Sequence, residues 1–363
     1  MRDRPKDAVE RCFHELKKRV DSSVEGLEID YSPRLRISKM PWLNYITQTI
    51  YSGKIKKERR DNSIIHLHNQ KLGTLLHFND FSPCIIACHD IIEYVRPEYR
   101  SITVARAFIY AYHTGTMKAD VIITPSKFTA EDIKRRFPKR SGRVEVVPNG
   151  VDHSLFRPSD RRIFLRQMGL PENRRYILFV GSEQPRKNVP AVVRTFIRAR
   201  REFSNLTLLK IGGKHEIPGH PVRIKLQKNL KEAGLLDSAL FLDNVSDEMM
   251  PYAYSSADAL VFPSLYEGFG LPILEAMACG TPVVATNATA IPEVAGDAAL
   301  LVTPGDDDAL FDAVLRVLND SKLHADLSTR GQQRAQFFNW DRSAQILLNI
   351  YHKLNPESRS YSN

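Results

Sequence analysis

Two successive series of alternating strand-like and helix-like segments constrain the fold of this chain most strongly. In the first series, short apolar runs that predict strands are separated by longer segments with helical periodicity. The predicted strands cover residues 63–68, 83–90, 120–126 and 143–150, and the predicted helices cover 6–20, 100–117 and 128–137. Strands that alternate with helices are typical of α/β folds with parallel sheets.

The second series follows residues 148–160, PNGVDHSLFRPSD, whose prolines and turn formers predict a linker. Its predicted strands cover 176–182, 206–213, 239–245, 259–264, 282–287 and 299–304, and a last helix is predicted at 341–354. A chain of 363 residues is also too long for one ordinary core. We therefore expect two Rossmann-like domains, with ligands in the crevice at the carboxyl ends of their strands.

Positive charge is concentrated in the first half of the chain. The whole chain has a net charge of +10, and residues 1–150 contain 27 Lys and Arg against 18 Asp and Glu. The densest runs are residues 54–60 and 134–143. One interpretation is a solvated surface, and another is a face that docks on anionic lipid headgroups or an acidic acceptor. Nucleic acid is less favoured as a partner, because no nucleic-acid-binding motif accompanies these runs.

The sequence favours a cytoplasmic protein, with peripheral attachment to the inner face of the membrane as an open alternative. No apolar run approaches the roughly 18 residues that a membrane span requires. The first residues, MRDRPKDAVERCF, are charged and lack the apolar segment of a signal peptide. Four cysteines in a chain of this length predict buried thiols rather than a disulfide framework.

The stretch YEGFGLPILEAMACG places two carboxylates around the start of a predicted helix. Residues 268–271 form the loop at the helix N-terminus, where unpaired N–H groups attract anions. Pro272 suits the first helical position. Glu267 is expected in the loop and Glu275 in the first helical turn, where both could read the hydroxyls of a ligand. The alternative is a helix-capping device with one solvated acid, and these residues alone do not decide between the two.

A second candidate site element is VGSEQPRKN, residues 180–188, which follows the first predicted strand of the second series. Gly181 would provide a tight turn, and Ser182, Arg186 and Lys187 would offer a hydroxyl and two cations to a diphosphate. Surface cations in a loop are the alternative interpretation. In the first series, His89 ends a predicted strand, where a lone histidine is more often structural.

Beyond these patterns, YEGFGLPILEAMACGTPVVAT resembles the E-x7-E signature of family 4 retaining glycosyltransferases, which have the two-domain GT-B fold. ILFVGSEQPRKNV, IPEVAGDAALLV and FNWDRSA resemble the second domain of that family, in the family's order. ADVIITPSKFTAEDI and RVEVVPNGVD resemble its first domain more loosely. The resemblance covers roughly residues 60–355.

This resemblance implies roles for individual residues. Glu275 would hold the ribose hydroxyls of a nucleotide sugar, and Glu267 would contact the sugar. Arg186 and Lys187 would neutralise the departing diphosphate, and His89 would touch the sugar or the β-phosphate from the first domain. The other implied donor-binding residues are Gly181, Ser182, Asn244, Val245, Ser246, Gly268, Phe269, Gly270 and Leu271.

The resemblance also implies a domain organisation. Residues 1–150 would form the acceptor-side domain, residues 151–340 the nucleotide-sugar-binding domain, and residues 341–363 a helix that returns to the first domain, followed by a tail. Members of the family usually begin with a strand and a glycine-rich loop before their first helix. This chain opens almost directly with a helix, so we expect that strand and loop to be missing, either because the start codon is misplaced or because the first domain is truncated.

The implied activity is transfer of a hexose from a nucleotide sugar to a glycan or a lipid-linked acceptor, with retention of the anomeric configuration. The PRKN and PEVAGDAALLV versions of the motifs look like mannosyltransferase branches, which favours GDP-mannose as the donor. No Asp-x-Asp metal motif accompanies the two candidate site segments, and neither a metal nor another cofactor is expected. The alternatives are a nucleotide-sugar epimerase on the same fold and an inactive, truncated remnant that binds a nucleotide or glycan.

Overall fold

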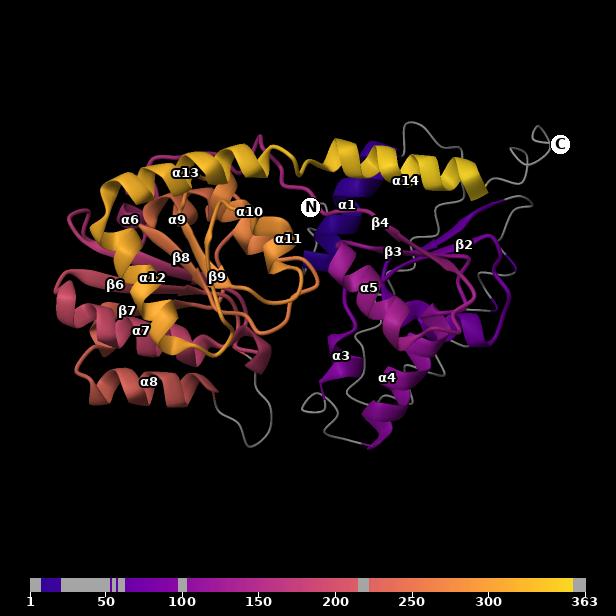
Figure 1. Ribbon diagram of the computed structural model, residues 1–363, viewed down its shortest axis with the longest axis horizontal. Helices are drawn as coiled ribbons and strands as arrows, with labels where there is room; N and C mark the ends of the chain where they lie inside the picture. Colours follow the sequence, from indigo (N-terminus) through magenta and orange to yellow (C-terminus); the bar gives the residue numbers. More distant parts are fainter. Residues whose placement is uncertain are drawn as a thin grey trace. The chain divides into compact units, whose positions relative to one another are not determined.

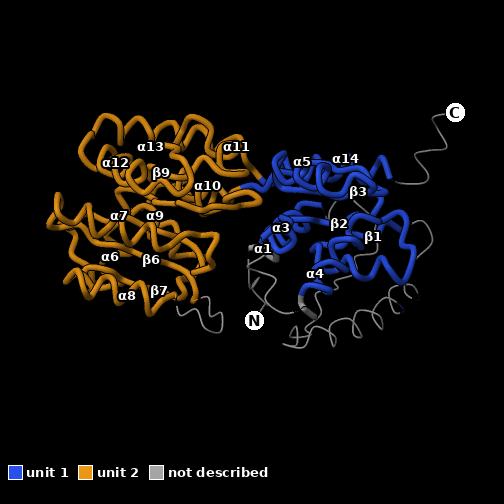
Figure 2. Tube along the Cα trace, turned by 60° about the horizontal axis from the view of Figure 1, so that its bottom comes forward, with its two compact units in different colours: residues 1–150, 340–363 blue, residues 151–339 orange. Residues whose placement is uncertain are grey.

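The computed structural model describes residues 8–20, 53, 57, 63–96, 103–214 and 222–354. The chain divides into two compact units (Figure 2). Unit 1 comprises residues 1–150 and 340–363, and unit 2 comprises residues 151–339. Most of the basic run at 54–60 lies outside the described residues.

Unit 1 contains a parallel sheet of four strands in chain order. The strands are β1 (Ile65–Leu67), β2 (Cys84–Ala87), β3 (Val121–Thr124) and β4 (Arg143–Val146). Its helices are α1 (Ala8–Val20), η1 (Gln70–His77), α3 (Ile92–Val95), α4 (Thr103–Thr116), α5 (Lys127–Arg136) and α14 (Trp340–Leu354) (Figure 1). Every residue of β2 and β3 is buried, as expected for strands covered on both faces.

The last helix, α14, packs against α1 within unit 1. Arg19 of α1 donates a hydrogen bond to Asp341 at 2.7 Å. Ser343 donates to the carbonyl of Pro148 at 2.5 Å, and the phenol of Tyr351 is bonded to a ring nitrogen of His66. The end of the described chain is thus part of the same unit as its beginning.

Unit 2 contains six parallel strands in the order β10-β9-β8-β5-β6-β7. They are β5 (Arg175–Val180), β6 (Leu206–Ile211), β7 (Ala239–Leu242), β8 (Ala259–Phe262), β9 (Val283–Thr286) and β10 (Leu300–Val302). This is the doubly wound Rossmann order, in which the first strand of the series lies in the middle. The predicted α/β class with two parallel sheets is therefore confirmed.

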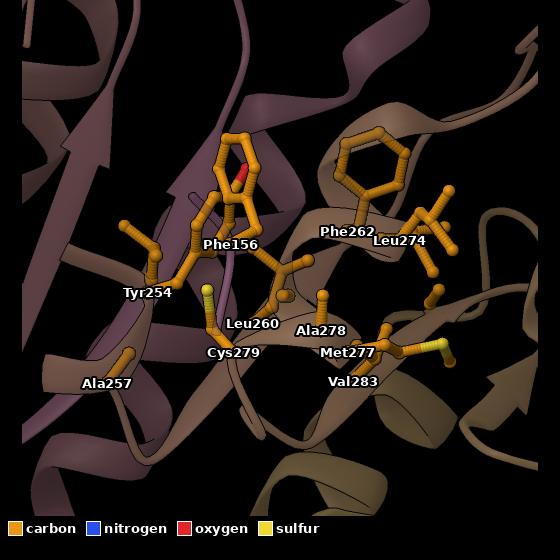
Figure 3. Close-up of a cluster of buried hydrophobic side chains, with 14 of the residues drawn as sticks. Phe156, Tyr254, Ala257, Leu260, Phe262, Leu274, Met277, Ala278, Cys279 and Val283 are labelled. Atoms are coloured by element: carbon orange, nitrogen blue, oxygen red, sulfur yellow. The ribbon is translucent and has the colours of Figure 1, made fainter. Parts of the chain in front are cut away.

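Helices cover both faces of this sheet (Figure 1). They are α6 (Arg161–Gln167), η3 (Pro185–Lys187), α7 (Val189–Glu202), α8 (Val222–Glu232), η4 (Leu236–Ser238), α9 (Met250–Ser256), α10 (Leu271–Ala278), α11 (Ile291–Ala295), α12 (Asp307–Asn319) and α13 (Ser321–Ala335). Alternate residues of β5 enter two separate cores, because successive side chains of a strand point to opposite faces. Tyr176 and Leu178 join one cluster, part of which Figure 3 shows, and Ile177 and Phe179 join the other.

All four cysteines are buried thiols, as the sequence predicts. No helix among the described residues combines the length and the apolar character that crossing a bilayer requires.

Candidate functional site

The carboxyl ends of β5 and β8 form the topological switch point of unit 2. These two strands are neighbours in the sheet, but the chain continues from β5 to β6 on one side and from β8 to β9 on the other. Doubly wound sheets bind their ligands at such a point. The loop after β5 carries Arg186, whose carbonyl accepts a hydrogen bond at 2.7 Å from the amide of Leu265 in the loop after β8. The fold thus brings the two predicted site segments together.

Glu267 forms a compact ion cluster with the two cations of the β5 loop. Lys187 Nζ lies 2.6 Å from Glu267 Oε1, and an Arg186 guanidinium nitrogen lies 2.9 Å from Oε2. The Glu267 side chain is only 8% exposed, and the Lys187 side chain only 10%. One carboxylate and two cations leave this largely dry cluster with a net positive charge, which favours an anionic ligand.

The two cations keep the carboxyl of Glu267 ionised. Burial alone would raise its pKa, but the adjacent charges of Lys187 and Arg186 outweigh burial and hold the pKa below its usual value. The backbone of Glu267 is also fixed, because its amide donates to the hydroxyl of Thr289 at 2.9 Å. Thr289 adopts a positive φ of 54°, which is uncommon for a β-branched residue. A strained residue thus holds the backbone of Glu267 in place.

Helix α10 begins at Leu271, one residue earlier than the sequence predicts. Gly270 is the N-cap, with a φ of 111° that a residue with a side chain rarely adopts. Pro272 is therefore the second helical residue rather than the first. Glu275 is the fifth and lies in the second turn, so the prediction of a first-turn position is wrong.

The helix-capping alternative for the two acids is also excluded. The alternative required one solvated acid, but the residues Glu267 and Glu275 are only 6% and 5% exposed, so neither is solvated. The carboxylate of Glu275 instead accepts a hydrogen bond at 2.7 Å from the phenol of Tyr254 in α9. A buried carboxylate is costly unless hydrogen-bonding groups hold it.

The other predicted site residues differ in how exposed their side chains are. Phe269 is buried, and its ring packs edge-on against Phe338 with the ring centres 5.8 Å apart. Asn244 and Ser246 are exposed after β7, whereas Val245 packs against the hydrophobic cluster. Ser182 lies partly buried in the loop after β5.

Glycine is required where the loops after β5 and β6 approach each other. A Cβ added to Gly212 would lie 2.4 Å from the carbonyl oxygen of Gly181, which is too close for any side chain. The amide of Gly181 donates to the carbonyl of Ile211 at 2.8 Å. Gly181 was predicted as a turn residue, but Gly212 was not predicted.

A second ion cluster beside these loops was also missed from the sequence. Glu183 follows Gly181, and its carboxylate pairs with Lys210 at 3.0 Å and with Arg223 of α8. Arg223 also contacts Asp243 at 2.7 Å, next to the predicted Asn244. Lys210 is buried in β6, whose sequence LTLLKI is otherwise mostly apolar, so the sequence pattern predicts a buried strand and gives no sign of an ion pair. The cluster links the loop after β5 to strand β6, to helix α8 and to the residue that follows β7.

His89 lies in unit 1 just after β2 and makes contacts within that unit. Its amide donates to the side chain of Gln70 at 3.2 Å, and its ring nitrogen lies 3.2 Å from the carbonyl oxygen of His68. The ring lines a cavity of about 30 Å³, large enough for one water molecule, together with His66 and Phe13. Burial, aided by the nearby His68 and His89, lowers the pKa of His66 to about 3, so this imidazole is neutral.

Comparison with known proteins places this chain in a family. The family model of glycosyl transferases group 1 matches residues 160–334, and that of glycosyltransferase family 4 matches residues 10–155. The O-antigen chain mannosyltransferase B of Escherichia coli is 31% identical over 265 residues, which cover 72% of this chain and 68% of that protein. The chain belongs to the family 4 glycosyltransferases. The predicted family and the predicted transferase class are therefore confirmed.

Two further relatives of this glycosyltransferase are named for different activities. The MMP α-(1→4)-mannosyltransferase of Mycolicibacterium hassiacum is 34% identical over 64% of this chain and 54% of that protein. The D-inositol 3-phosphate glycosyltransferase of Salinispora arenicola is 33% identical over 70% of this chain and 58% of that protein. The chain therefore spans only a little more than half the length of these two relatives.

Solved structures confirm the GT-B fold class. Sucrose-phosphate synthase from Thermosynechococcus elongatus has a TM-score of 0.72 and 26% identity, over 91% of this chain and 82% of that one. WaaG, a glycosyltransferase involved in lipopolysaccharide biosynthesis, has a TM-score of 0.75 over 97% of both chains. At 15% identity, WaaG shows the fold alone.

Proposed function

We propose that the protein transfers a hexose, with mannose from GDP-mannose as the first choice, to a glycan or a lipid-linked acceptor with retention of configuration. One observation carries this proposal. Arg186, Lys187 and Glu267 meet at the switch point of unit 2, beside the N-terminus of α10. Two fixed cations and a helix N-terminus are the groups that a departing nucleoside diphosphate requires.

The mechanism follows from where charge develops. Breaking the bond between the anomeric carbon and the β-phosphate oxygen leaves negative charge on the diphosphate and positive charge on the sugar. Arg186 and Lys187 would stabilise the first charge, and Glu267 would contact the hydroxyls of the sugar. The acceptor oxygen would attack the anomeric carbon from the same face while the leaving phosphate takes the acceptor's proton. This route requires no side-chain nucleophile.

The identity of the donor rests on the relatives. Two of those named above are mannosyltransferases, which supports GDP-mannose. Another structure with the same fold, HepE of Anabaena, has been seen with UDP-glucose, and at 22% identity it does not choose between donors. Glu275 would hold the ribose of either nucleotide, and Asn244 to Ser246 would line its base.

A thermal-shift panel of GDP-mannose, UDP-glucose and a dTDP-sugar tests this choice. GDP-mannose is expected to raise the melting temperature most, since a ligand that binds the native state stabilises it by RT ln(1 + [L]/Kd). A larger shift with UDP-glucose would assign a different donor, and no shift with any sugar would contradict the proposed site.

The proposal includes no metal. Within the described ranges, no three His, Cys, Asp or Glu side chains are arranged so that they could hold a metal ion. The thermal-shift panel is therefore run with and without EDTA, and equal shifts are expected. Shifts that disappear in EDTA would show that a metal takes part in donor binding.

Peripheral attachment to an anionic membrane is a further part of the proposal. In the basic run at the end of α5, Arg135 and Arg136 pair with the buried Asp132 at 2.5 and 3.0 Å. Lys134 and Lys139 are exposed beside this pair of arginines. The single carboxylate of Asp132 offsets only one of these two arginine charges, and the two exposed lysines add to the positive charge that is left.

Changing Lys134 and Lys139 together to glutamine is expected to weaken binding to phosphatidylserine vesicles about 30-fold at low salt, since each surface lysine contributes about 1 kcal/mol. Co-sedimentation with the vesicles measures this. Lys225 and Lys228, which are exposed on α8 of unit 2, supply the matched control double variant. Equal binding of both variants and the unchanged protein would mean that the run at α5 is a solvated face.

A further inference from the structure

Tyr254 of α9 contacts the segment that carries Glu275 at two points, Glu275 itself and Thr281. Its side chain is fully buried, and its phenol donates to Glu275 Oε2 at 2.7 Å. Its backbone carbonyl accepts a hydrogen bond at 2.8 Å from the hydroxyl of Thr281, three residues after the end of α10. Figure 3 shows Tyr254 packed in the hydrophobic cluster near Phe156, whose ring meets it edge-on. Tyr254 is therefore held in place by backbone and ring contacts alike.

A carboxylate at the position of Glu275 needs such a partner. The terminal torsion of a glutamate side chain is broad, so packing alone does not fix the plane of the carboxylate. A buried acceptor must also be hydrogen-bonded, and a hydrogen bond to a charged acceptor is stronger than one between neutral groups. The phenol of Tyr254 supplies such a bond and thereby sets the direction of the carboxylate.

We propose that Tyr254 is a positioning residue that orients Glu275 toward the vicinal hydroxyls of the nucleotide's ribose. This inference rests on the proposed ribose role of Glu275. Two neighbouring hydroxyls can both donate well to one carboxylate only when its plane has the right orientation. Tyr254 thus controls how strongly the site distinguishes a ribose from a sugar that lacks these hydroxyls, without touching the nucleotide itself.

The experiment compares GDP with 2′,3′-dideoxy-GDP by calorimetric titration. The unchanged protein is expected to bind GDP about 100-fold more tightly, because the ribose hydroxyls donate to a charged acceptor. Glu275→Ala is expected to lose this preference. Tyr254→Phe, which removes only the hydroxyl, is expected to reduce the preference about tenfold, or about 1.4 kcal/mol. If the unchanged protein binds UDP and not GDP, the uridine pair replaces the guanosine pair.

Tyr176→Phe is the matched control. Tyr176 is also fully buried in unit 2, and its phenol donates at 2.5 Å to the carbonyl of Pro171 rather than to a site residue. Both variants lose one phenol hydrogen bond, so both melting temperatures are expected to fall, and Tyr176→Phe shows what the loss of such a bond does away from the site. Only Tyr254→Phe is expected to change the preference for ribose.

The outcomes distinguish a failure of the role proposed for Tyr254 from a failure of the ribose role proposed for Glu275. A full preference in Glu275→Ala would contradict the ribose role itself. Loss of preference in Glu275→Ala with a full preference in Tyr254→Phe would overturn the inference alone. Should Tyr254→Phe fail to fold, Glu275→Gln replaces it, because the amide oxygen of glutamine can still accept from Tyr254. Glu275→Gln is then expected to keep part of the preference, and a loss as complete as in Glu275→Ala would overturn the inference.

Discussion

Changing Arg186 and Lys187 together to alanine is expected to slow glycosyl transfer by at least about 10³-fold, because charge stabilisation at a leaving group is commonly the largest catalytic term. Both cations lie within 3 Å of Glu267, and the proposal assigns them to the same ligand. Initial rates with the donor chosen by the thermal-shift panel measure the effect. A rate near that of the unchanged protein would refute the role of the cations.

Loss of the two cations also leaves the buried Glu267 without compensation, which destabilises a fold by itself. The rates are therefore read together with the melting temperature. The control changes Arg194 and Arg198 of α7 to alanine, which removes two ion pairs with Asp307 and Asp308 of α12. This control is expected to keep full activity, because neither pair belongs to the site.

Replacing Glu267 with glutamine is expected to have opposite effects on nucleotide binding and on transfer. In the structure, Glu267 pairs with both cations that the diphosphate would use. A neutral side chain of the same shape leaves their positive charge to the phosphates, so GDP is expected to bind about tenfold more tightly. Transfer is expected to slow by at least about 100-fold, because a charged contact with the sugar is lost.

Calorimetry with GDP and initial rates with the full donor separate these two effects. The matched control is Glu172→Gln, which removes an exposed ion pair with Arg166 in the same unit and is expected to change neither quantity. Weaker binding of GDP to Glu267→Gln would mean that Glu267 helps to hold the nucleotide. That result would contradict the proposal that Arg186 and Lys187 exchange Glu267 for the phosphates of the nucleotide.

The strands could be predicted because strands buried on both faces have a clear signature. VIIT in β3 and LTLLKI in β6 are short, nearly continuous apolar runs bounded by polar or turn-forming residues. The α10 boundary was missed by one residue because Gly270 alone sets it, through a backbone conformation that the sequence permits but does not require. That shift moved Glu275 from the first helical turn to the second.

Contacts within the site could be predicted less well, since they depend on which strands become neighbours. The sequence assigned Arg186, Lys187 and Glu267 to one ligand, and the structure shows that they also pair with one another. Tyr254 and Thr289 were not predicted, because each contacts a site acid about 20 residues away along the chain. Such pairings follow from the sheet order, which no local pattern encodes.

The central claim is that the switch point of unit 2 binds a diphosphate through Arg186 and Lys187. Titration of the unchanged protein with GDP and with guanosine tests it most directly, because the two ligands differ only in their phosphates. GDP is expected to bind at least about 100-fold more tightly, since charge-assisted contacts contribute several kcal/mol. Equal affinities for GDP and guanosine would contradict the claim.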